Sequence, residues 1–304
     1  MGAGHNQAGM GGGTSASRHK GSLTWALAMT GTFLIVEVIG GLWTGSLALL
    51  ADAAHMATDV GGLFMALVAV RFAERPATPQ MTYGYVRTEV LSALLNAVVL
   101  LVVTVFVLRE AYFRLSAPPE ILSGPMLVVA VVGLLVNLIS MRMLHAGSQE
   151  SLNLKGAYFE VLADMLGSVG VILAALVVML TGWTIADPII GAAIGLFIVP
   201  RTWILLKGAL RILLEATPAH IDAEKLRSRL AALPGVSDVH DLHVWTLTSG
   251  QEAMSAHLVV NDLANSGAVL AAARDSLHSE FDLTHTTLQI EDAKAAKAEG
   301  ETHR

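Results

Sequence analysis

Two pairs of potential metal ligands lie within long apolar stretches of the sequence. His55 and Asp59 form one pair, and Glu160 and Asp164 form the other. Each pair is spaced i, i+4, so on a helix its two side chains project from the same face, about one turn apart. Imidazole nitrogens and carboxylate oxygens both bind divalent metal ions. Two such helices facing each other would therefore offer four donors to one ion.

The depth of these residues favours a functional role. At a rise of about 1.5 Å per residue, His55 and Asp59 lie roughly 12 and 18 Å into their apolar stretch, and Glu160 and Asp164 roughly 9 and 15 Å into theirs. A carboxylate at the centre of a bilayer costs about 2.5–3.5 kcal/mol, which a bound divalent cation would offset. Taken singly, each residue could equally be a hydrogen-bonding group between helices. Together they predict a metal site.

Asp52 precedes His55 by three residues and is a candidate supporting residue. Metal-bound histidines commonly donate their second ring N–H to a carboxylate, which orients the ring. A hydrogen bond near the start of the helix is an equal alternative for Asp52.

The elements that must position these residues are apolar helices. The chain is 54% hydrophobic and 14% charged, with a mean hydropathy of +0.60, which is typical of a membrane protein. Since about 20 helical residues cross a bilayer, residues 22–206 predict an all-α membrane domain of six transmembrane helices. The expected spans are 22–43, 47–72, 88–112, 124–144, 154–180 and 185–206.

The remaining residues predict a soluble domain and two disordered tails. Residues 1–21 are rich in Gly, Ser and Ala, and residues 293–304 in Ala, Lys and Glu. Residues 207–292 mix polar and apolar positions, and their periodicity predicts an open ferredoxin-like α+β domain of order αββαβ. The expected elements are a helix over 223–233, strands over 236–248 and 253–260, a helix over 267–281 and a strand over 285–291.

Basic residues in the short loops predict the orientation. They gather on the side that also carries both termini, whereas the opposite side has only Arg109 and Arg114. The positive-inside rule therefore places both termini and the soluble domain in the cytoplasm, most simply beneath a plasma or inner membrane. The basic residues on the predicted cytoplasmic side are Arg18, Lys20, Arg71, Arg75, Arg87, Arg142, Lys155, Lys207 and Arg211.

Composition also limits the possible chemistry and partners. The chain contains no cysteine, so histidine and carboxylate must bind any metal. The net charge is −6, and most of the acidic excess follows Lys207. Such a domain disfavours nucleic acid as a partner and mildly favours cations.

Several short motifs follow one another along the chain: residues 37–41 (EVIGG), 45–59 (GSLALLADAAHMATD), 83–85 (YGY), 187–188 (DP) and 239–245 (VHDLHVW). In this order they resemble the motifs of the cation diffusion facilitators, specifically of their cobalt-zinc-cadmium resistance branch. The resemblance extends over nearly the whole sequence.

The resemblance implies a transport site formed by His55, Asp59, Glu160 and Asp164. Many zinc-transporting relatives have histidine at the position of Glu160, so this site resembles a variant with one nitrogen and three oxygen donors. Because oxygen donors are harder, we expect zinc first, with cobalt and cadmium also transported and some relaxation toward iron or manganese. No cofactor is expected beyond these divalent ions.

The resemblance also implies that two copies pair through the soluble domain as a homodimer that binds metal. His240, His257 and His285 fall on its three predicted strands and are the expected cytoplasmic ligands. A surface histidine is the alternative for each.

The expected activity is secondary active export of metal in exchange for protons. An empty cluster of acids, shielded from water and mutually repelling, would hold protons that a metal ion expels. Access from alternate faces would then couple export to an inward proton gradient. A membrane metal sensor without transport is the main alternative. A membrane metalloenzyme is less favoured, because the sequence contains no His-Glu-x-x-His motif.

Overall fold

The computed structural model describes residues 20–73, 75–148, 152–248 and 250–298. The chain divides into two compact units. One comprises the residues up to Phe64 together with Asn96–Trp203, and the other comprises Met65–Leu95 and Ile204–Arg304. Most of the predicted N-terminal tail, residues 1–19, lies outside the described residues.

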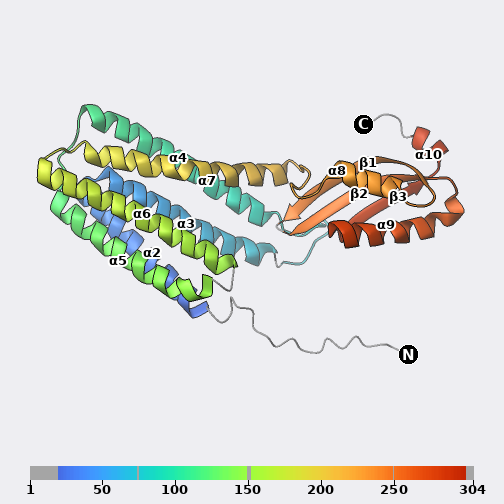
Figure 1. Ribbon diagram of the computed structural model, residues 1–304, viewed down its shortest axis with the longest axis horizontal. Coiled ribbons are helices and arrows are strands. Elements are labelled where there is room, and N and C mark those ends of the chain that lie inside the picture. The colour runs from blue at the N-terminus through green and yellow to red at the C-terminus, as the bar shows by residue number, and fades with distance from the viewer. Residues whose placement is uncertain (1–19, 74, 149–151, 249, 299–304) are drawn as a thin grey trace. The chain divides into compact units, whose positions relative to one another are not determined.

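A helical membrane domain occupies the first two thirds of the described chain (Figure 1). Four of its helices contain segments that are long and apolar enough to cross a bilayer: Thr88–Ser116, Ser123–His145, Tyr158–Thr181 and Ala186–Leu213. A shorter apolar helical segment covers Ala28–Thr44. The long helices are α2 (Lys20–Thr44), α3 (Leu47–Ala73), α4 (Thr88–Ser116), α5 (Ser123–Ser148), α6 (Leu152–Thr181) and α7 (Ala186–Leu213).

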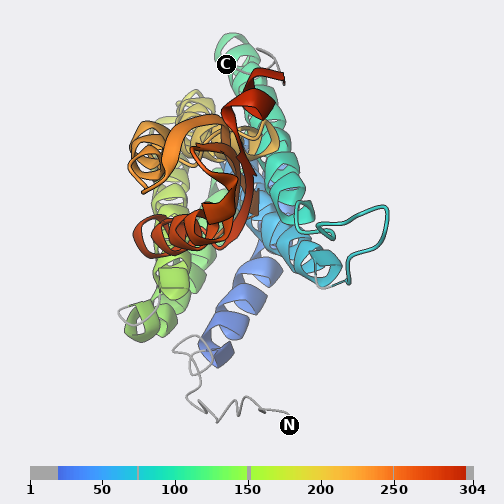
Figure 2. The same ribbon diagram turned by 90° about the vertical axis from the view of Figure 1, so that its right-hand side faces the viewer.

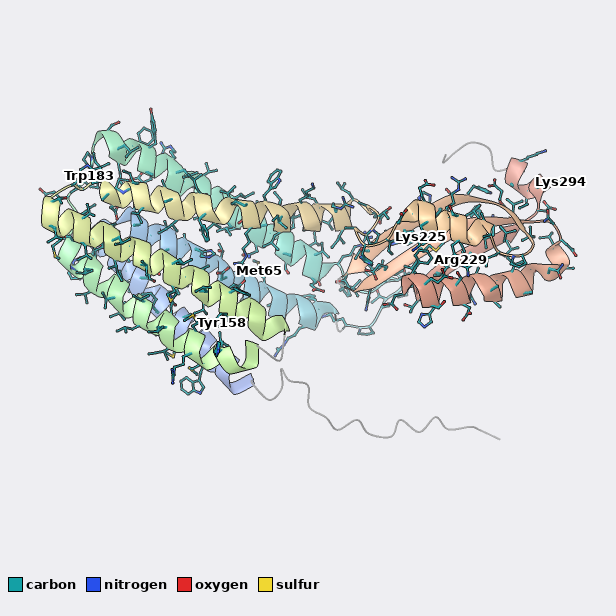
Figure 3. The ribbon with its side chains drawn as sticks, viewed as in Figure 1. Met65, Tyr158, Trp183, Lys225, Arg229 and Lys294 are labelled. Atoms are coloured by element: carbon teal, nitrogen blue, oxygen red, sulfur yellow. The ribbon has the colours of Figure 1, made fainter. Side chains whose placement is uncertain are left out.

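Large apolar side chains cover the outside of these helices. Leu42 is 69% exposed, Phe197 65% and Ile204 71%. Soluble proteins rarely expose so many large apolar groups together, so this surface suits a lipid environment. Trp183, in the connection between α6 and α7, is half exposed (Figure 3). Tryptophan is common where a helix leaves the hydrocarbon region.

The inside of the membrane domain is closely packed. Helix α5 packs along α6, and α2 packs along α5 (Figure 1). Gly191 of α7 lies against the start of α3, where an added Cβ would be 3.2 Å from the Ala48 nitrogen. Small residues at such contacts let helix backbones approach each other, which is the main source of attraction between helices in lipid.

The C-terminal domain has the predicted order of helix, strand, strand, helix and strand. Strands β1 and β2 are antiparallel, β2 and β3 are parallel, and the sheet order is β1-β2-β3. The elements are α8 (Ala223–Ala231), β1 (Val236–Thr248), β2 (Gln251–Val260), the short 3-10 helix η1 (Leu263–Asn265), α9 (Ser266–Phe281) and β3 (His285–Glu291).

Helices α8 and α9 lie on the same side of the strands (Figure 2). Their apolar faces and the inner face of the sheet share one core, which includes Leu226, Leu258 and Leu277. Lys225 and Arg229 lie on α8 (Figure 3). Arg229 donates a 2.6 Å hydrogen bond to Glu280 of α9, which lowers the pKa of that carboxyl below its usual value.

The C-terminal tail differs from the prediction in part. Residues Ala293–Ala298 form a short helix, α10, where the sequence analysis predicted disorder. The oxygen Oδ1 of Asp292 accepts hydrogen bonds from the backbone N–H groups of Lys294 and Ala295. This cap satisfies donors that a helix start otherwise leaves unpaired, which supports an Ala-rich turn. Residues 299–304 of the predicted tail lie outside the described residues.

Leu258→Ala tests the core of the C-terminal domain. Leu258 is 0% exposed, so we expect the cavity to lower the free energy of unfolding of this domain by about 2–5 kcal/mol. Hydrogen exchange of the strand amides in the full-length protein measures the effect. Leu263→Ala is the control, because Leu263 is 49% exposed and its loss should change stability by less than about 0.5 kcal/mol. Equal effects of the two substitutions would contradict the assigned core.

Candidate metal centre

Helices α3 and α6 bring three predicted ligands together inside the membrane domain. One donor atom each from His55, Asp59 and Asp164 lies within 4.8 Å of the others. His55 Nε2 is 3.7 Å from Asp59 Oδ2 and 3.7 Å from Asp164 Oδ1. The first distance follows from the i, i+4 spacing on α3, and the second from the packing of α6 beside it. The arrangement offers one nitrogen and two carboxylates to a single ion.

These donors are buried without hydrogen-bond partners. His55 and Asp164 are each 6% exposed. Within the described part of the chain, Asp59 Oδ2, Asp164 Oδ1 and His55 Nδ1 accept or donate no hydrogen bond. A buried polar atom without a partner is costly, and a buried carboxylate more so. A cation bound among these atoms would remove most of that cost, so the donor set fits a divalent metal ion.

Glu160, the fourth predicted ligand, has a different partner in this structure. It precedes Asp164 by one turn of α6, and its Oε1 accepts a hydrogen bond from Nη2 of Arg201 on α7. The two side chains are partly exposed, at 41% and 47%. The structure therefore assembles three of the four predicted donors and ion-pairs the fourth with an arginine that the sequence analysis did not consider.

Asp52 lies in a second buried polar group of the membrane domain. Its carboxylate is buried near the side chains of Glu37 on α2 and Ser168 on α6, but accepts no hydrogen bond from the described residues. Its Oδ1 is so close to α6 that a Cβ added at Gly167 would lie 2.2 Å away. Asp52 thus joins α2, α3 and α6 one turn before His55. A role in orienting the His55 ring stays a prediction.

Asp187, at the start of α7, holds the first turn of α3. Its carboxylate accepts hydrogen bonds from the Ser46 hydroxyl at 2.5 Å, the Leu47 N–H at 2.7 Å and the Ala48 N–H at 3.2 Å. An acid at a helix N-terminus pairs free N–H groups and complements the helix dipole. The sequence analysis noted Asp187 only as part of a motif. A carboxylate in an apolar segment was the available signal for this role.

A second group of metal-ligand types lies on the sheet of the C-terminal domain. Donor atoms of His240, His257 and Glu291 lie within 4.8 Å of one another. His240 of β1 and His257 of β2 are Cα partners in the antiparallel ladder, and their rings are 5.1 Å apart. Glu291 Oε1 lies 2.5 Å from His240 Nε2 and 3.9 Å from His257 Nδ1. Three adjacent strands therefore converge on one site.

His285, the third predicted cytoplasmic ligand, lies at the other end of β3. Its ring contacts Tyr83 edge to face, with centroids 5.8 Å apart. Glu291 was missed by the sequence analysis, although it is an even number of residues from His285 and so projects from the same face of β3. The predicted ligand set took one histidine from each strand. An acidic residue at an even spacing from His285 on the same strand was the signal that could have identified Glu291.

The fold and the site define a membrane protein that binds and moves cations. Comparison with known families matches residues 23–214 to the cation efflux transmembrane domain and residues 218–293 to the cation efflux protein cytoplasmic domain. The chain therefore belongs to the cation efflux family, the cation diffusion facilitators. It is a transporter rather than an enzyme.

Individual relatives cover almost the whole chain. The metal cation efflux system protein CzcD of Cupriavidus metallidurans is 50% identical over 305 residues, which cover 100% of this chain and 94% of the relative. The cadmium, cobalt and zinc/H(+)-K(+) antiporter of Bacillus velezensis is 38% identical, with 96% and 93% covered. A solved structure of the metal-bound C-terminal domain of the CzcD transporter from Cuprividus metallidurans is 38% identical. It covers 23% of this chain and 99% of that chain, with a TM-score of 0.22.

Asp187→Ala tests the anchoring of α3. Removing a helix cap costs about 0.5–2 kcal/mol, so we expect a lower melting temperature in detergent. Because α3 carries His55 and Asp59, we also expect a higher KM for zinc flux. Glu110→Gln is the control, since Glu110 is 45% exposed and forms an ion pair with Arg114 one turn away on α4. A variant of Asp187 with unchanged melting and unchanged KM would refute the anchoring role.

A pair of substitutions tests the composition of the cytoplasmic group. Glu291→Gln should weaken zinc binding to the C-terminal domain by about tenfold or more, because it removes a charged donor. His285→Ala should have little effect on this affinity, since His285 contacts Tyr83 instead. Isothermal titration of the full-length protein in an Asp164→Asn background isolates this site. The reverse ranking would restore His285 as the third ligand.

Proposed function

We propose that this transporter exports divalent metal ions from the cytoplasm in exchange for protons, with zinc as the principal ion and cobalt and cadmium as further substrates. The transport site consists of His55, Asp59 and Asp164, and Glu160 supplies a fourth donor when it leaves Arg201. The second candidate, a metal sensor without transport, would require only the cytoplasmic group.

The observation that carries this proposal is the burial of unpaired donors at the centre of a membrane domain. Asp59 and Asp164 come from different helices, α3 and α6, and both approach the His55 ring. A structural role would pair these atoms with protein donors. A transport role requires them to be available to an ion that enters, binds and leaves.

Proton exchange follows from the same donors. When no ion is bound, the adjacent carboxylates Asp59 and Asp164 are best accommodated in water-poor surroundings by holding protons. An arriving divalent ion replaces those protons, since both compete for the same oxygen lone pairs. The name of the Bacillus velezensis relative, an antiporter that includes H(+), supports this coupling.

Zinc is favoured by the chemistry of the donors. Three protein ligands that include an imidazole, with one further position open, suit the four-coordinate geometry that zinc prefers. Mixed nitrogen and oxygen donors also accept cobalt and cadmium. The name of the Bacillus velezensis relative includes cadmium, cobalt and zinc.

We also propose that the protein has six transmembrane helices and lies in the plasma or inner membrane, with both termini in the cytoplasm. Helices α2 and α3 have 25 and 27 residues, which is enough for a hydrocarbon core of about 30 Å. The proposed domains are a membrane domain over 22–206 and an open ferredoxin-like domain over 207–292, flanked by tails. Family matches at 23–214 and 218–293 support these boundaries.

The C-terminal domain is proposed to form a homodimer and to bind a regulatory metal ion. The match of residues 218–293 to ZT_dimer, the cytoplasmic domain of cation efflux proteins, supports the first part. The convergence of His240, His257 and Glu291 supports the second. Occupation of this group would hold three strands together by ligand bonds.

Asp164→Asn in proteoliposomes tests transport. The substitution removes a charged donor that is buried against His55, so zinc flux should fall by at least about a hundredfold. Glu120→Gln removes the same charge from an exposed residue and should retain wild-type flux. In the wild type, an imposed pH gradient, acidic on the side to which zinc moves, should accelerate zinc flux.

Two outcomes would contradict the proposal. Undiminished zinc flux in Asp164→Asn would contradict the proposed transport site. Zinc flux that does not change with the pH gradient would contradict proton exchange. A metal sensor would not move zinc even as the wild type. Its cytoplasmic response to metal would be retained in Asp164→Asn.

A further inference from the structure

The fourth acid of the membrane domain is engaged by a positive charge that belongs to the protein. Glu160 of α6 accepts its hydrogen bond from Arg201 of α7. The two residues are separated by 41 positions in the sequence, so only the packing of α6 against α7 brings them together. Both also act electrostatically on the donor group, because Asp59 and Asp164 each experience the charges of Glu160 and Arg201.

From these contacts we propose that Arg201 is a specificity-determining residue. Its positively charged side chain is ion-paired with the Glu160 carboxylate, and an entering metal ion must displace this side chain to gain Glu160 as its fourth ligand. This inference rests on the proposed transport site. It adds Arg201 as a competitor of the metal ion for Glu160, which the donor residues alone do not reveal.

The charges around the site support this role. Asp59, Glu160 and Asp164 together carry three negative charges when ionised, and Arg201 contributes one positive charge. The remaining two negative charges match one divalent ion when His55 is neutral, as a metal-bound imidazole must be. Without Arg201, the same ion would leave one negative charge uncompensated in a water-poor site, which would hold the ion more tightly.

The pair is also positioned and exposed so that it can open. Glu160 lies one turn nearer than Asp164 to the N-terminal end of α6, which is the cytoplasmic end in the proposed orientation. Its side chain is 41% exposed and that of Arg201 is 47% exposed, whereas those of His55 and Asp164 are each 8% exposed. Side chains that the protein leaves this uncovered have room to separate and to change partners. An ion arriving from the cytoplasm therefore meets the Glu160–Arg201 pair before the buried donors.

Competition by Arg201 has consequences for both release and selectivity. An arginine that returns to Glu160 removes one oxygen donor from the bound ion and favours its departure. While Glu160 is held by Arg201, three protein donors remain, which suits zinc better than ions that prefer more oxygen ligands, such as manganese. Loss of Arg201 should free Glu160 and broaden the range of ions.

Zinc flux through the full-length protein in proteoliposomes tests the inference. Arg201→Gln should lower the KM for zinc by about tenfold, because it removes both a repelling charge and a competitor for Glu160. It should also lower the maximal rate, since release becomes slower, and raise the ratio of manganese to zinc flux. Arg201→Lys keeps the charge and should retain a KM near that of the wild type.

A double-mutant cycle separates specific competition from a general field effect. In a Glu160→Gln background, Arg201→Gln should lower the KM by much less than in the wild type, since no acid remains to be released. Arg109→Gln removes an arginine at the other end of the membrane domain and should leave the KM unchanged. Arg201→Met is a second neutral replacement if Arg201→Gln is not monodisperse.

The inference is overturned if Arg201→Gln leaves the KM unchanged, or if its effect is equal in the two backgrounds. An unchanged ratio of manganese to zinc flux overturns the role in selectivity. Asp164→Asn keeps the two proposals apart. If Asp164→Asn abolishes flux while the Arg201 variants behave as the wild type, only the proposed role of Arg201 is contradicted. If Asp164→Asn retains flux, the proposed transport site is contradicted.

Discussion

The membrane domain is built around buried carboxylates for which the described residues supply few hydrogen-bond donors. Asp59 Oδ2 and Asp164 Oδ1 are buried and accept no hydrogen bond from the described residues, although each lies 3.7 Å from the same histidine nitrogen. An isolated acid in such surroundings is strongly unfavourable, and two acids on one histidine are more so. Only a proton or a metal ion can balance them without a new side chain. The two alternatives exclude each other, which is the physical basis of the proposed exchange of metal ions for protons.

The rest of the domain limits how far these acids can move apart. Asp187 of α7 fixes the first turn of α3 through three hydrogen bonds, and Gly191 allows α7 to approach the same turn closely. Asp52 packs against α6 at Gly167, one turn before His55. The start of α3 is thus held by polar contacts with α7, and Asp52 lies close against the middle of α6. Exchange of the Glu160–Arg201 pair takes place at the other end, where side chains are more exposed.

Helical periodicity was sufficient to predict the faces of α3 and α6, because residues four apart must lie together on any helix. The order of helices and strands along the C-terminal domain was also predictable, since the spacing of apolar residues is a local signal. The partner of Glu160 was not predictable in this way. Arg201 lies 41 residues away, and its contact depends on how α7 rotates about its axis. Glu291 was overlooked for a different reason, because attention to histidine excluded an acid on the same face of β3. The α10 helix was missed because its Asp292 cap was not weighed against an Ala-rich composition that suggested a tail.

The two candidate metal groups differ in how they balance charge, and this difference bears on their roles. In the C-terminal domain, Glu291 is 4% exposed and lies 2.5 Å from Nε2 of His240, so its partner is itself a candidate metal ligand. In the proposed site, metal binding replaces this internal contact by ligand bonds and leaves the strands in register. In the membrane domain, the charged partner of Glu160 is an arginine, which cannot lose its proton in a protein. An ion must therefore move that side chain physically rather than discharge it. A group that exchanges one internal contact for ligand bonds suits regulation, whereas a group that must move a side chain between helices α6 and α7 suits the cycle of a transporter.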